Sequence, residues 1–420
     1  MLVYKFGGAS VKDAEGVRNI GQIINHCVDG KLVVVLSAFG KTTNHLERLL
    51  DLAGSNTTRF ESEFEKLKDL HYTIIHGLID NEDHKLFDTV KGLFDILHMN
   101  LLSNDFDSYD QKYDQTVSTG ELLSTLIVSE YLNTVGINNE WLDVRSVFIS
   151  DETYREARIN WEITQERVNK TFTFDTTGIY LTQGFIAGNQ KKQTTTLGRE
   201  GSDFSAAILG NLLNADYVTI WKDVPGILTA DPQHFDAPGK LKEISYQEAV
   251  ELAYYGAKVI HPKTIKPLEN KDISLNVRSF LHPNEEGTII RRTASFKSKL
   301  PIYILKQNQI LISVFVKDFS FVLEDGISRI LNYMREHRVK VNLIQSSAIS
   351  FSVCVDKYND KVQKLIELMN DDFKVLYNEE LELITIRHYT PKAIAELTRN
   401  REIIVEQKSR STAHFVLRKL

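Results

Sequence analysis

A loop rich in threonine and glycine holds the first residues that could do chemistry. The run Thr194-Thr-Thr-Leu-Gly-Arg-Glu-Gly-Ser-Asp203 leads into residues 204–212, whose apolar side chains recur at helical spacing. This pattern predicts a helix with Ser202 as its N-cap. Because a helix start carries partial positive charge and unpaired amides, the loop and the Arg199 guanidinium predict a receptor for an anionic group. Taken alone, Asp203 is better explained as an acidic first-turn residue that complements the helix dipole.

The segment Lys5-Phe-Gly-Gly8 is a second candidate, at the end of a strand-like run. Its two glycines would expose backbone amides to a phosphate, while the lysine supplies a cation at the strand end. In isolation the segment is equally explained by a tight turn beside a solvated lysine. Gly40-Lys-Thr42 also follows a strand, but the leading glycine of a P-loop would fall at Val35, so we reject a P-loop there.

A third candidate follows a predicted strand over residues 217–221. Lys222 and Asp223 begin a loop in which Pro225 and Gly226 favour a tight turn. Ligands of α/β proteins bind at the carboxyl ends of parallel strands, so Lys222 and Asp223 are candidates for a ligand site. The alternative interpretation is a long surface loop without a ligand.

The elements that must position these residues have an α/β pattern. Continuous apolar strands separated by helices, such as the helix predicted over residues 17–27, imply a parallel sheet that is covered on both faces. The strands predicted for this region are residues 3–6, 32–36, 180–186, 217–221 and 273–280. Residues 46–104 lack strand signals and are predicted to be helical. Capping boxes predict helix starts at Ser118-Thr-Gly-Glu121 and Ser245-Tyr-Gln-Glu248.

The last third of the chain has a different pattern, of short alternating units. Residues 309–378 have the order βαββαβ of the ferredoxin-like motif, and residues 379–420 hold a shorter second copy. A strand over residues 301–306 is a candidate to complete this second copy. We therefore expect two domains, formed by residues 1–292 and 293–420.

Composition and charge exclude several classes of protein. The 420 residues are 25% charged and 42% hydrophobic, as in ordinary globular proteins of two or three domains. A net charge of −6 provides no electrostatic footprint for nucleic acid. The longest apolar run, residues 32–36, is too short to span a membrane, and Met1-Leu-Val-Tyr-Lys5 has no secretory pattern, so we expect a cytoplasmic protein. Cys27 and Cys354 are predicted to be small core residues, since neither has a metal-ligand partner at suitable spacing.

Taken together, the sequence resembles the aspartokinases of the amino-acid kinase family, with tandem C-terminal ACT units. The segments that carry the resemblance are Lys5–Ser10, Val35–Asn44, Ser118–Leu122, Gly184–Gly188, Thr196–Asp203, Asp223–Pro232 and Glu248–Pro262. The resemblance implies an α/β domain in three layers with a mainly parallel central sheet, followed by two ferredoxin-like α+β units. It also implies transfer of the ATP γ-phosphoryl group to the side-chain carboxylate of L-aspartate, which gives 4-phospho-L-aspartate in the first step of the lysine, threonine and methionine pathway.

The resemblance also implies a role for each candidate residue. Lys5 would steady the transferring phosphoryl group, and Asp203 would orient the reaction centre directly or through Mg²⁺. Mg²⁺ would arrive with ATP and be held largely by phosphates and water, so no set of protein metal ligands is expected. Arg199 would hold a carboxylate of aspartate, and Glu121 its ammonium group. The other substrate-binding residues would be Ser37, Ala38, Thr43, Phe185 and Ser202, and the nucleotide-binding residues would be Gly7, Gly8, Lys222, Asp223 and Lys258.

Three residues of the nucleotide loop depart from the family pattern. The family often has Thr at the place of Lys222, Tyr at the place of Leu228 and Arg at the place of Gln233. A stacking ring and a phosphate-facing cation would be missing. ATP would therefore bind more weakly, or through Lys222.

The ACT units of the family bind an end-product amino acid and join subunits, which implies an effector site and a homodimer or higher homo-oligomer. The candidate effector residues are Asn342, Ser346 and Ser347. Lysine-sensitive relatives tend to have an acidic residue at the place of Asn342. Without that carboxylate, a charge-assisted hydrogen bond to a lysine effector is lost, so the sequence argues against lysine feedback.

Two alternatives remain at this point. A glutamate or acetylglutamate kinase would use the same chemistry but ordinarily lacks two ACT units. An amino-acid-binding regulatory protein with a weakly active or inactive kinase domain would explain the altered nucleotide loop. The intact Lys5, Glu121, Arg199 and Asp203 argue against this second alternative.

Overall fold

The computed structural model describes residues 1–27, 30–55, 57–257, 260–292, 300–317, 324–357 and 359–419. Contacts between residues divide the chain into two compact units. The first unit contains Met1–Ile227, Leu241–Val250 and Val259–Ala294, and the second contains Leu228–Lys240, Glu251–Lys258 and Ser295–Leu420. The division into a catalytic and a regulatory domain at residue 292 stays a prediction.

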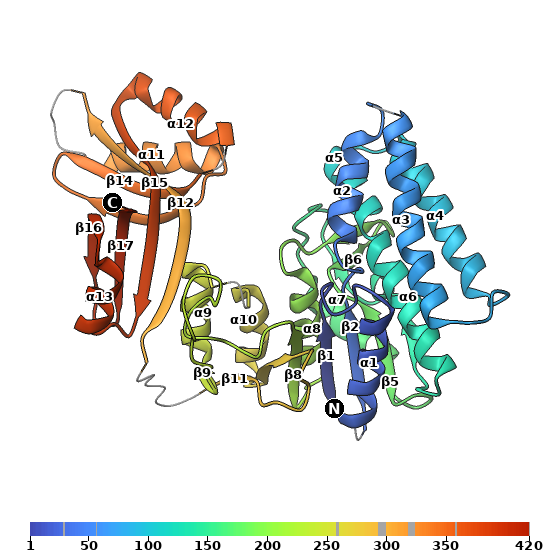
Figure 1. The fold of residues 1–420 in the computed structure, drawn as a ribbon. Coiled ribbons are helices and arrows are strands. Elements are labelled where there is room, and N and C mark those ends of the chain that lie inside the picture. Colours follow the sequence, from blue (N-terminus) through green and yellow to red (C-terminus); the bar gives the residue numbers. More distant parts are fainter. Residues whose placement is uncertain are drawn as a thin grey trace. The chain divides into compact units, whose positions relative to one another are not determined.

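An eight-stranded sheet is the centre of the first unit, in the order β3-β5-β2-β1-β8-β10-β11-β9 (Figure 1). Its strands are β1 (Leu2–Phe6), β2 (Leu32–Leu36), β3 (Glu140–Leu142), β5 (Ile179–Gln183), β8 (Tyr217–Lys222), β9 (Glu243–Ser245), β10 (Ser274–Ser279) and β11 (Thr288–Arg291). Neighbouring strands from β3 to β10 are parallel, and β11 is antiparallel to β10. The predicted α/β fold with a mainly parallel central sheet is confirmed.

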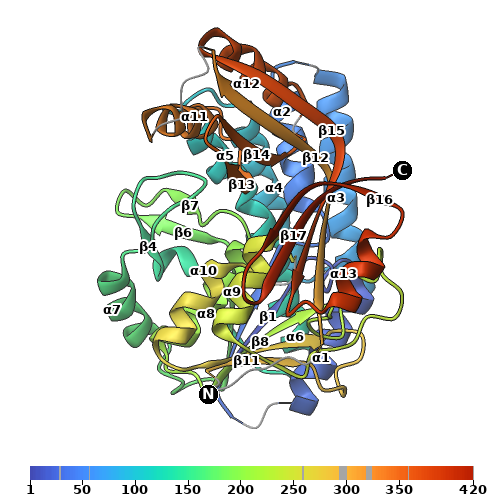
Figure 2. The same cartoon turned by 90° about the vertical axis from the view of Figure 1, so that its left-hand side faces the viewer.

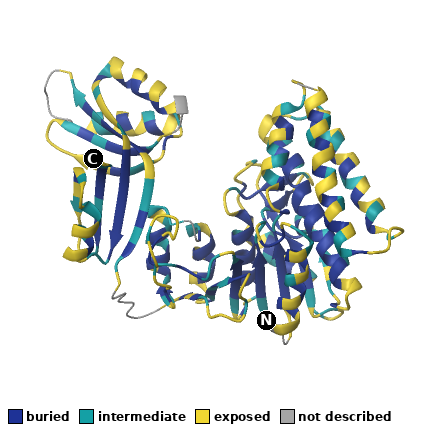
Figure 3. Ribbon diagram, in the orientation of Figure 1, coloured by how far each residue is buried: buried dark blue, intermediate teal, exposed yellow. Residues whose placement is uncertain are grey.

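Helices form the two outer layers around this sheet. The helices of residues 1–292 are α1 (Ala14–Cys27), α2 (Thr42–Leu52), α3 (Thr57–Leu78), α4 (Leu86–Leu102), α5 (Tyr109–Val117), α6 (Thr119–Thr134), α7 (Trp161–Thr171), α8 (Gly201–Leu212), α9 (Tyr246–Tyr255) and α10 (Pro262–Asn270), with a 3-10 turn, η1 (Val144–Ser146). α8 and α10 pack on one face of the sheet, while α1, α3, α4 and α6 share a core with the other face. The strands are accordingly buried, and the outer surfaces of the helices are exposed (Figure 3).

Strand alternation decides which face of the sheet each functional side chain reaches. In β1, Tyr4 and Phe6 enter the core shared with α1 and α6, so Lys5 points to the opposite face, toward α8. In β8, the Trp221 ring stacks on the Phe6 ring at a centroid distance of 6.0 Å, and Lys222 reaches the same face as Lys5. Two cations therefore lie on the α8 face of neighbouring parallel strands.

A three-stranded sheet contains β4 (Ile149–Ser150), β6 (Ile186–Asn189) and β7 (Thr194–Thr196). The prediction of one strand over residues 180–186 is wrong, because the chain is divided there into β5 and β6 at Gly184 and Phe185. Phe185 has a φ of 70°, which lies in the left-handed region and interrupts the extended backbone. This break allows β6 to join a second sheet.

One predicted helix cap is wrong, and another is confirmed. α8 begins at Gly201 and has Glu200 as its N-cap residue, without a side-chain cap, so Ser202 lies inside the first turn. No side chain of Glu200 therefore caps the N-terminus of α8, where the helix carries partial positive charge. At α9, the Ser245 hydroxyl accepts the Glu248 amide at 3.1 Å, as the capping box predicted.

A six-stranded antiparallel sheet forms the core of the second unit, in the order β13-β14-β12-β15-β17-β16. Its elements are β12 (Ile302–Val316), α11 (Glu324–Glu336), β13 (Val341–Ser346), β14 (Ser350–Asp356), α12 (Asn359–Asp372), β15 (Phe373–Arg387), α13 (Pro391–Thr398), β16 (Arg401–Lys408) and β17 (Thr412–Lys419). β12 and β15 run side by side along their length (Figure 2), and residues 302–306 pair with residues 383–387 of the second predicted copy. This sheet with its helices agrees with the predicted ferredoxin-like α+β region.

Two further expectations concern cysteine and the membrane. Cys354 is fully buried in β14, as predicted for a small core residue, whereas the side chain of Cys27 lies outside the described residues. In the described part of the chain, no helix is both long and apolar enough to cross a membrane. The cytoplasmic location stays a prediction.

Candidate active site

Four segments that meet at the carboxyl edge of the large sheet form the candidate active site. Parallel register places the last residues of β1, β2 and β5 and the Trp221 of β8 at the same level. The segments that follow therefore emerge side by side, where α/β proteins bind ligands. The predicted residues in these segments are Gly7, Gly8, Ser37, Ala38, Phe185, Lys222 and Asp223.

Asp203 holds two ammonium groups at this edge. Its carboxylate lies 2.6 Å from Lys5 Nζ and 3.3 Å from Lys222 Nζ, and the aspartate is completely buried. Burial alone would raise the pKa of Asp203, but the charges and hydrogen bonds of the two lysines hold this pKa below its usual value. An ionised Asp203 therefore fixes both cations, and the three groups together carry a net positive charge.

Close contacts favour glycine at position 7 and require it at position 8 in the loop after β1. A Cβ atom at Gly7 would lie 3.2 Å from Lys5 Nζ, and a Cβ atom at Gly8 would lie 2.6 Å from the Gly40 carbonyl oxygen. The Gly40 amide donates to the Gly8 carbonyl at 3.0 Å, so the loops after β1 and β2 are joined backbone to backbone. Without side chains in the way, the backbone of this loop can approach a phosphate closely.

The segment after β5 packs closely against the start of α8. A Cβ atom at Gly184 would lie 2.5 Å from Ser202 Cβ, and a Cβ atom at Gly201 would lie 2.7 Å from the Phe185 ring. The Phe185 amide donates to the Ser205 hydroxyl at 3.0 Å, which helps to hold the left-handed backbone of Phe185. The structure therefore brings Phe185 and Ser202 together, as expected of residues that line one pocket.

Glu121 is a buried carboxylate on α6. The residue is 2% exposed, and Oε2 has no hydrogen-bond partner among the described residues. Burial raises the pKa of Glu121 to about 8, although hydrogen bonds from its own amide and that of Ala38 oppose this shift. A buried carboxylate with an unsatisfied oxygen is suited to bind a cationic group of a ligand.

Ser118 does not cap α6, contrary to the capping box. Its hydroxyl donates to the Gln115 carbonyl at 3.3 Å, because α5 ends directly before it and leaves Ser118 in helical geometry. On the same helix, Ser124 donates to the Ser37 carbonyl at 2.9 Å. α6 is thus tied to the loop after β2, and Glu121 is held beside Ser37 and Ala38.

The other predicted site residues have fewer contacts. Thr43 is half-buried in the first turn of α2, and Asp223 is exposed directly after β8. Arg199 is exposed on the loop before α8, and its guanidinium makes no ion pair within the described ranges. Lys258 lies outside the described residues, so its nucleotide contact stays a prediction.

The candidate effector residues belong to the second unit. The Asn342 side chain accepts from Lys306 Nζ at 2.7 Å and donates to side chains of β12 and β14 at 2.9 and 3.0 Å. Internal partners therefore already use the Asn342 amide. Ser346 is exposed, and the Ser347 hydroxyl lies 2.7 Å from the Ser350 hydroxyl within one turn.

The sequence analysis missed one buried carboxylate of the first unit. This is Asp114 of α5, which contacts β7. It is completely buried and accepts three hydrogen bonds. α5 is mostly polar, and its two acidic residues, Asp110 and Asp114, lie one turn apart, so no pattern in the sequence distinguishes a buried Asp114 from a solvated one.

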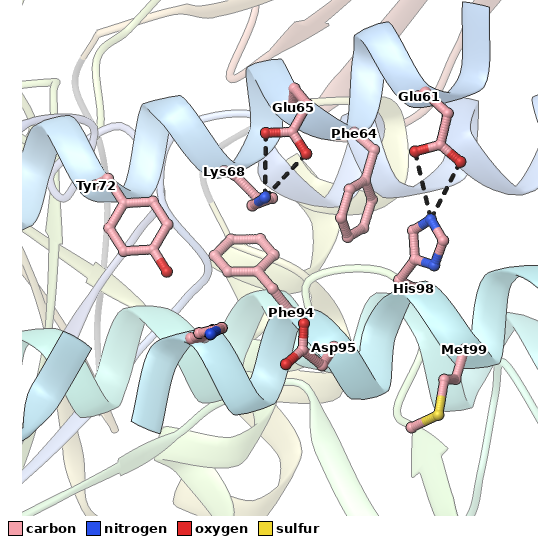
Figure 4. Close-up of a pocket in the computed structure, with 10 residues that line it drawn as sticks. Glu61, Phe64, Glu65, Lys68, Tyr72, Phe94, Asp95, His98 and Met99 are labelled. Carbon is pink, nitrogen blue, oxygen red and sulfur yellow. Dashed lines mark hydrogen bonds and ion pairs between the residues drawn. The ribbon is translucent and has the colours of Figure 1, made fainter. Parts of the chain in front are cut away.

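A pocket of about 530 Å³ between α3 and α4 is lined by none of the predicted site residues (Figure 4). Its lining includes Phe64 and two pairs of polar side chains. Glu65 lies 2.9 Å from Lys68, and Glu61 lies 3.2 Å from His98. The predicted catalytic residues Lys5 and Asp203 therefore lie at the sheet edge and not at this helical groove.

Comparisons with known proteins agree with the geometry of the sheet edge. Residues 1–279 match the model of the amino acid kinase family. Aspartokinase 2, chloroplastic, of Arabidopsis thaliana is 30% identical over 96% of this chain and 73% of its own length. Lysine-sensitive aspartokinase 3 of Escherichia coli (strain K12) is 31% identical over 85% of this chain and 78% of its own length. The crystal structure of E. coli aspartokinase III in complex with aspartate and ADP has a TM-score of 0.83 at 27% identity, and the match covers 99% of this chain and 96% of that chain.

The chain therefore belongs to the amino acid kinase family. The fold, the glycine loops and the similarity along most of the chain define this class of kinase. Within the family, the chain groups with the aspartokinases, as the sequence resemblance predicted.

Proposed function

We propose that this site transfers the γ-phosphoryl group of ATP to the side-chain carboxylate of L-aspartate. A carboxylate oxygen attacks the γ-phosphorus, the bond from that phosphorus to the bridging oxygen breaks, and 4-phospho-L-aspartate and ADP are formed. The observation that carries the proposal is the pair of cations, Lys5 and Lys222, around the buried Asp203. The bound aspartate and ADP of the E. coli relative support the same substrates.

The two lysines lower the electrostatic barrier of the reaction. The attacking carboxylate and the phosphates are anions that repel each other, and negative charge spreads over the transferring group. Cations already fixed by Asp203 stabilise this charge without a cost of reorganisation. Because the carboxylate of aspartate is ionised at neutral pH, no general base is needed. Asp203 thus acts by orienting Lys5 and Lys222.

Aspartate is recognised at both of its ends. Arg199 would bind a carboxylate through its planar guanidinium, and its exposed position leaves this group accessible. Glu121 would bind the ammonium group, which supplies the partner that its buried Oε2 lacks among the described residues. Ser37, Ala38, Thr43, Phe185 and Ser202 complete the proposed substrate pocket.

Mg²⁺ is proposed to enter with ATP. In the described ranges, no group of three or more His, Cys, Asp or Glu side chains forms a metal site, and Asp203 is engaged by two lysines. A carboxylate that already holds two lysines fits an ion that is held largely by phosphates and water. The ion would neutralise phosphate charge, while Gly7 and Gly8 provide backbone amides to the nucleotide.

The six-stranded sheet of the second unit is proposed to bind an amino-acid effector and to join subunits. The name of the lysine-sensitive E. coli relative supports feedback by an amino acid in this group of enzymes. The Asn342 amide, which already binds Lys306, makes lysine itself a poor ligand at this position.

Trapping of the acyl phosphate with hydroxylamine tests the proposed reaction. The protein is incubated with ATP, Mg²⁺ and either L-aspartate, L-glutamate or N-acetyl-L-glutamate. Only aspartate should yield a hydroxamate. A hydroxamate from glutamate or acetylglutamate alone would identify the rival kinases. Amino-acid binding without any hydroxamate would favour a regulatory protein.

A further inference from the structure

We propose that Asp114 is a positioning residue that sets the distance between Arg199 and Glu121, the two groups assigned to opposite ends of aspartate. The inference rests on the proposed function and adds to it a residue that touches neither substrate. Asp114 lies on α5, is completely buried and is not part of the lysine pair around Asp203.

Hydrogen bonds connect Asp114 to the strand that leads to Arg199. Asp114 Oδ2 accepts the backbone amides of Thr196 at 2.8 Å and Arg155 at 3.0 Å, and Oδ1 accepts the Thr196 hydroxyl at 2.8 Å. The next residue of α5, Gln115, donates to a carbonyl of β7 at 2.7 Å. α5 therefore holds β7 at both ends, and Arg199 follows this strand after Leu197 and Gly198.

The segment around Arg155 supports the turn before Arg199 from a second direction. Arg155 has a φ of 68°, and its carbonyl oxygen would lie 3.2 Å from a Cβ atom at Gly198. Gly198 has a φ of 76°, which favours glycine. Since Asp114 binds the Arg155 amide and Thr196 together, it fixes both the strand that leads into the turn of Arg199 and the segment that packs against this turn.

The backbone of Asp114 connects to the other end of the substrate site. α5 continues almost directly into α6, and the Ser118 amide donates to the Asp114 carbonyl at 3.4 Å. Glu121 follows in the first turn of α6. One rigid helical connection thus joins Glu121 to Asp114, whose side chain is bonded to the Arg199 segment. Displacement of β7 would change the spacing between the two groups that are proposed to bind aspartate.

Hydrogen-bond geometry, rather than charge, is the contribution that we assign to Asp114. Burial raises the pKa of Asp114 to about 6, although the hydrogen bonds from Arg155 and Thr196 oppose the shift. The side chain of asparagine has the same shape as that of aspartate. Its amide oxygen can accept both backbone amides, and its Nδ2 can donate to the Thr196 hydroxyl. An alanine side chain can make none of these hydrogen bonds.

Steady-state kinetics of Asp114→Ala and Asp114→Asn test the proposal in the full chain. Asp114→Ala should raise KM for aspartate at least about tenfold, with less than about threefold change in kcat or in KM for ATP, because only the aspartate pocket loses its spacing. Asp114→Asn should restore KM for aspartate to within about threefold of the unmodified protein. A matched control is Thr164→Val on α7, which removes the buried hydroxyl that accepts the Ile149 amide at 3.1 Å. This control should lower the Tm and leave KM for aspartate unchanged.

A double-mutant cycle shows whether Asp114 acts through Arg199. In an Arg199→Ala background, Asp114→Ala should change KM for aspartate by less than about threefold, because the group that it positions is gone. An equal effect of Asp114→Ala in both backgrounds, or equal losses for aspartate and ATP, would overturn the proposal. So would an unchanged KM in Asp114→Ala alone. If the unmodified protein forms no acyl phosphate from aspartate, the proposed function fails instead.

Discussion

The ammonium group of Lys5 lies 2.6 Å from the carboxylate of Asp203, and both residues are buried. Lys5 comes from the first strand of the chain, and Asp203 from the first turn of α8. A buried ion pair is costly to form unless both charges are well placed, so a pair at a ligand-binding edge favours a functional role. Five predictions test the roles assigned to this pair, to the substrate-binding residues and to the effector position.

Replacement of Lys5 should affect turnover more than binding. Lys5→Ala removes a cation that stabilises the transferring phosphoryl group, and kcat should fall by about two to three orders of magnitude. KM for aspartate should change less than about threefold, because other residues bind that substrate. Lys12→Ala, at an exposed lysine, is the control and should be active. A large rise in KM for aspartate with normal kcat would show that the role of Lys5 is misassigned.

Replacement of Arg199 should mainly weaken aspartate binding. A hydrogen bond to a charged group contributes about 1.5–3 kcal/mol, so Arg199→Ala should raise KM for aspartate roughly 10- to 100-fold. KM for ATP should stay nearly constant. Arg158→Ala provides a control at another exposed arginine. Unchanged aspartate kinetics in Arg199→Ala would remove this residue from the substrate site.

The affinity for aspartate should depend on the ionisation of Glu121. Its pKa of about 8 means that the empty site is mostly protonated at neutral pH, whereas the aspartate ammonium requires the ionised carboxylate. KM for aspartate should therefore fall as pH rises, by up to about tenfold per pH unit below the pKa, and then level off. Measurement at saturating ATP from about pH 6.5 to 8.5 covers this range. Glu121→Gln should have a higher KM for aspartate, and this KM should not depend on pH. If KM of the Glu121→Gln variant changes with pH as it does in the unmodified protein, the assignment of Glu121 is wrong.

Lys222 should contribute to kcat/KM for ATP. Its ammonium group lies 3.3 Å from Asp203, on the same side as Lys5. Lys222→Thr introduces the residue that the family often has and should lower kcat/KM for ATP by about tenfold, with a smaller change for aspartate. The control is Lys170→Thr on the surface of α7. A variant with unchanged ATP kinetics would limit Lys222 to a structural contact with Asp203.

Lysine should be a weak effector of this enzyme. The Asn342 oxygen already accepts from Lys306 Nζ, and Asp356 already accepts from the Asn342 amide, so these groups are engaged before a second ammonium group arrives. Initial rates with lysine, threonine or methionine added at roughly millimolar concentration should show little inhibition by lysine. Strong inhibition by micromolar lysine would show that the effector site uses other residues.

The sequence predicted the fold class and supplied the candidate residues of the site because its signals are local. Apolar runs and alternation place Lys5 at the end of a buried strand, and the glycines beside it predict a loop with accessible amides. The spacing of apolar residues after Asp203 predicts α8. Such patterns depend on residues close together in the chain, so packing between distant segments does not change them.

Only the tertiary structure decided which of these residues meet. Lys222 reaches Asp203 because β1 and β8 are neighbours in one parallel register, and the sequence of β8 alone does not contain that information. The raised pKa of Glu121 depends on burial by other segments, and the role proposed for Asp114 depends on β7 lying against α5. The break at Phe185 was missed for the same reason. Burial, charge coupling and backbone contacts between distant residues are properties of the packed chain, whereas spacing along the chain predicts only the elements that pack.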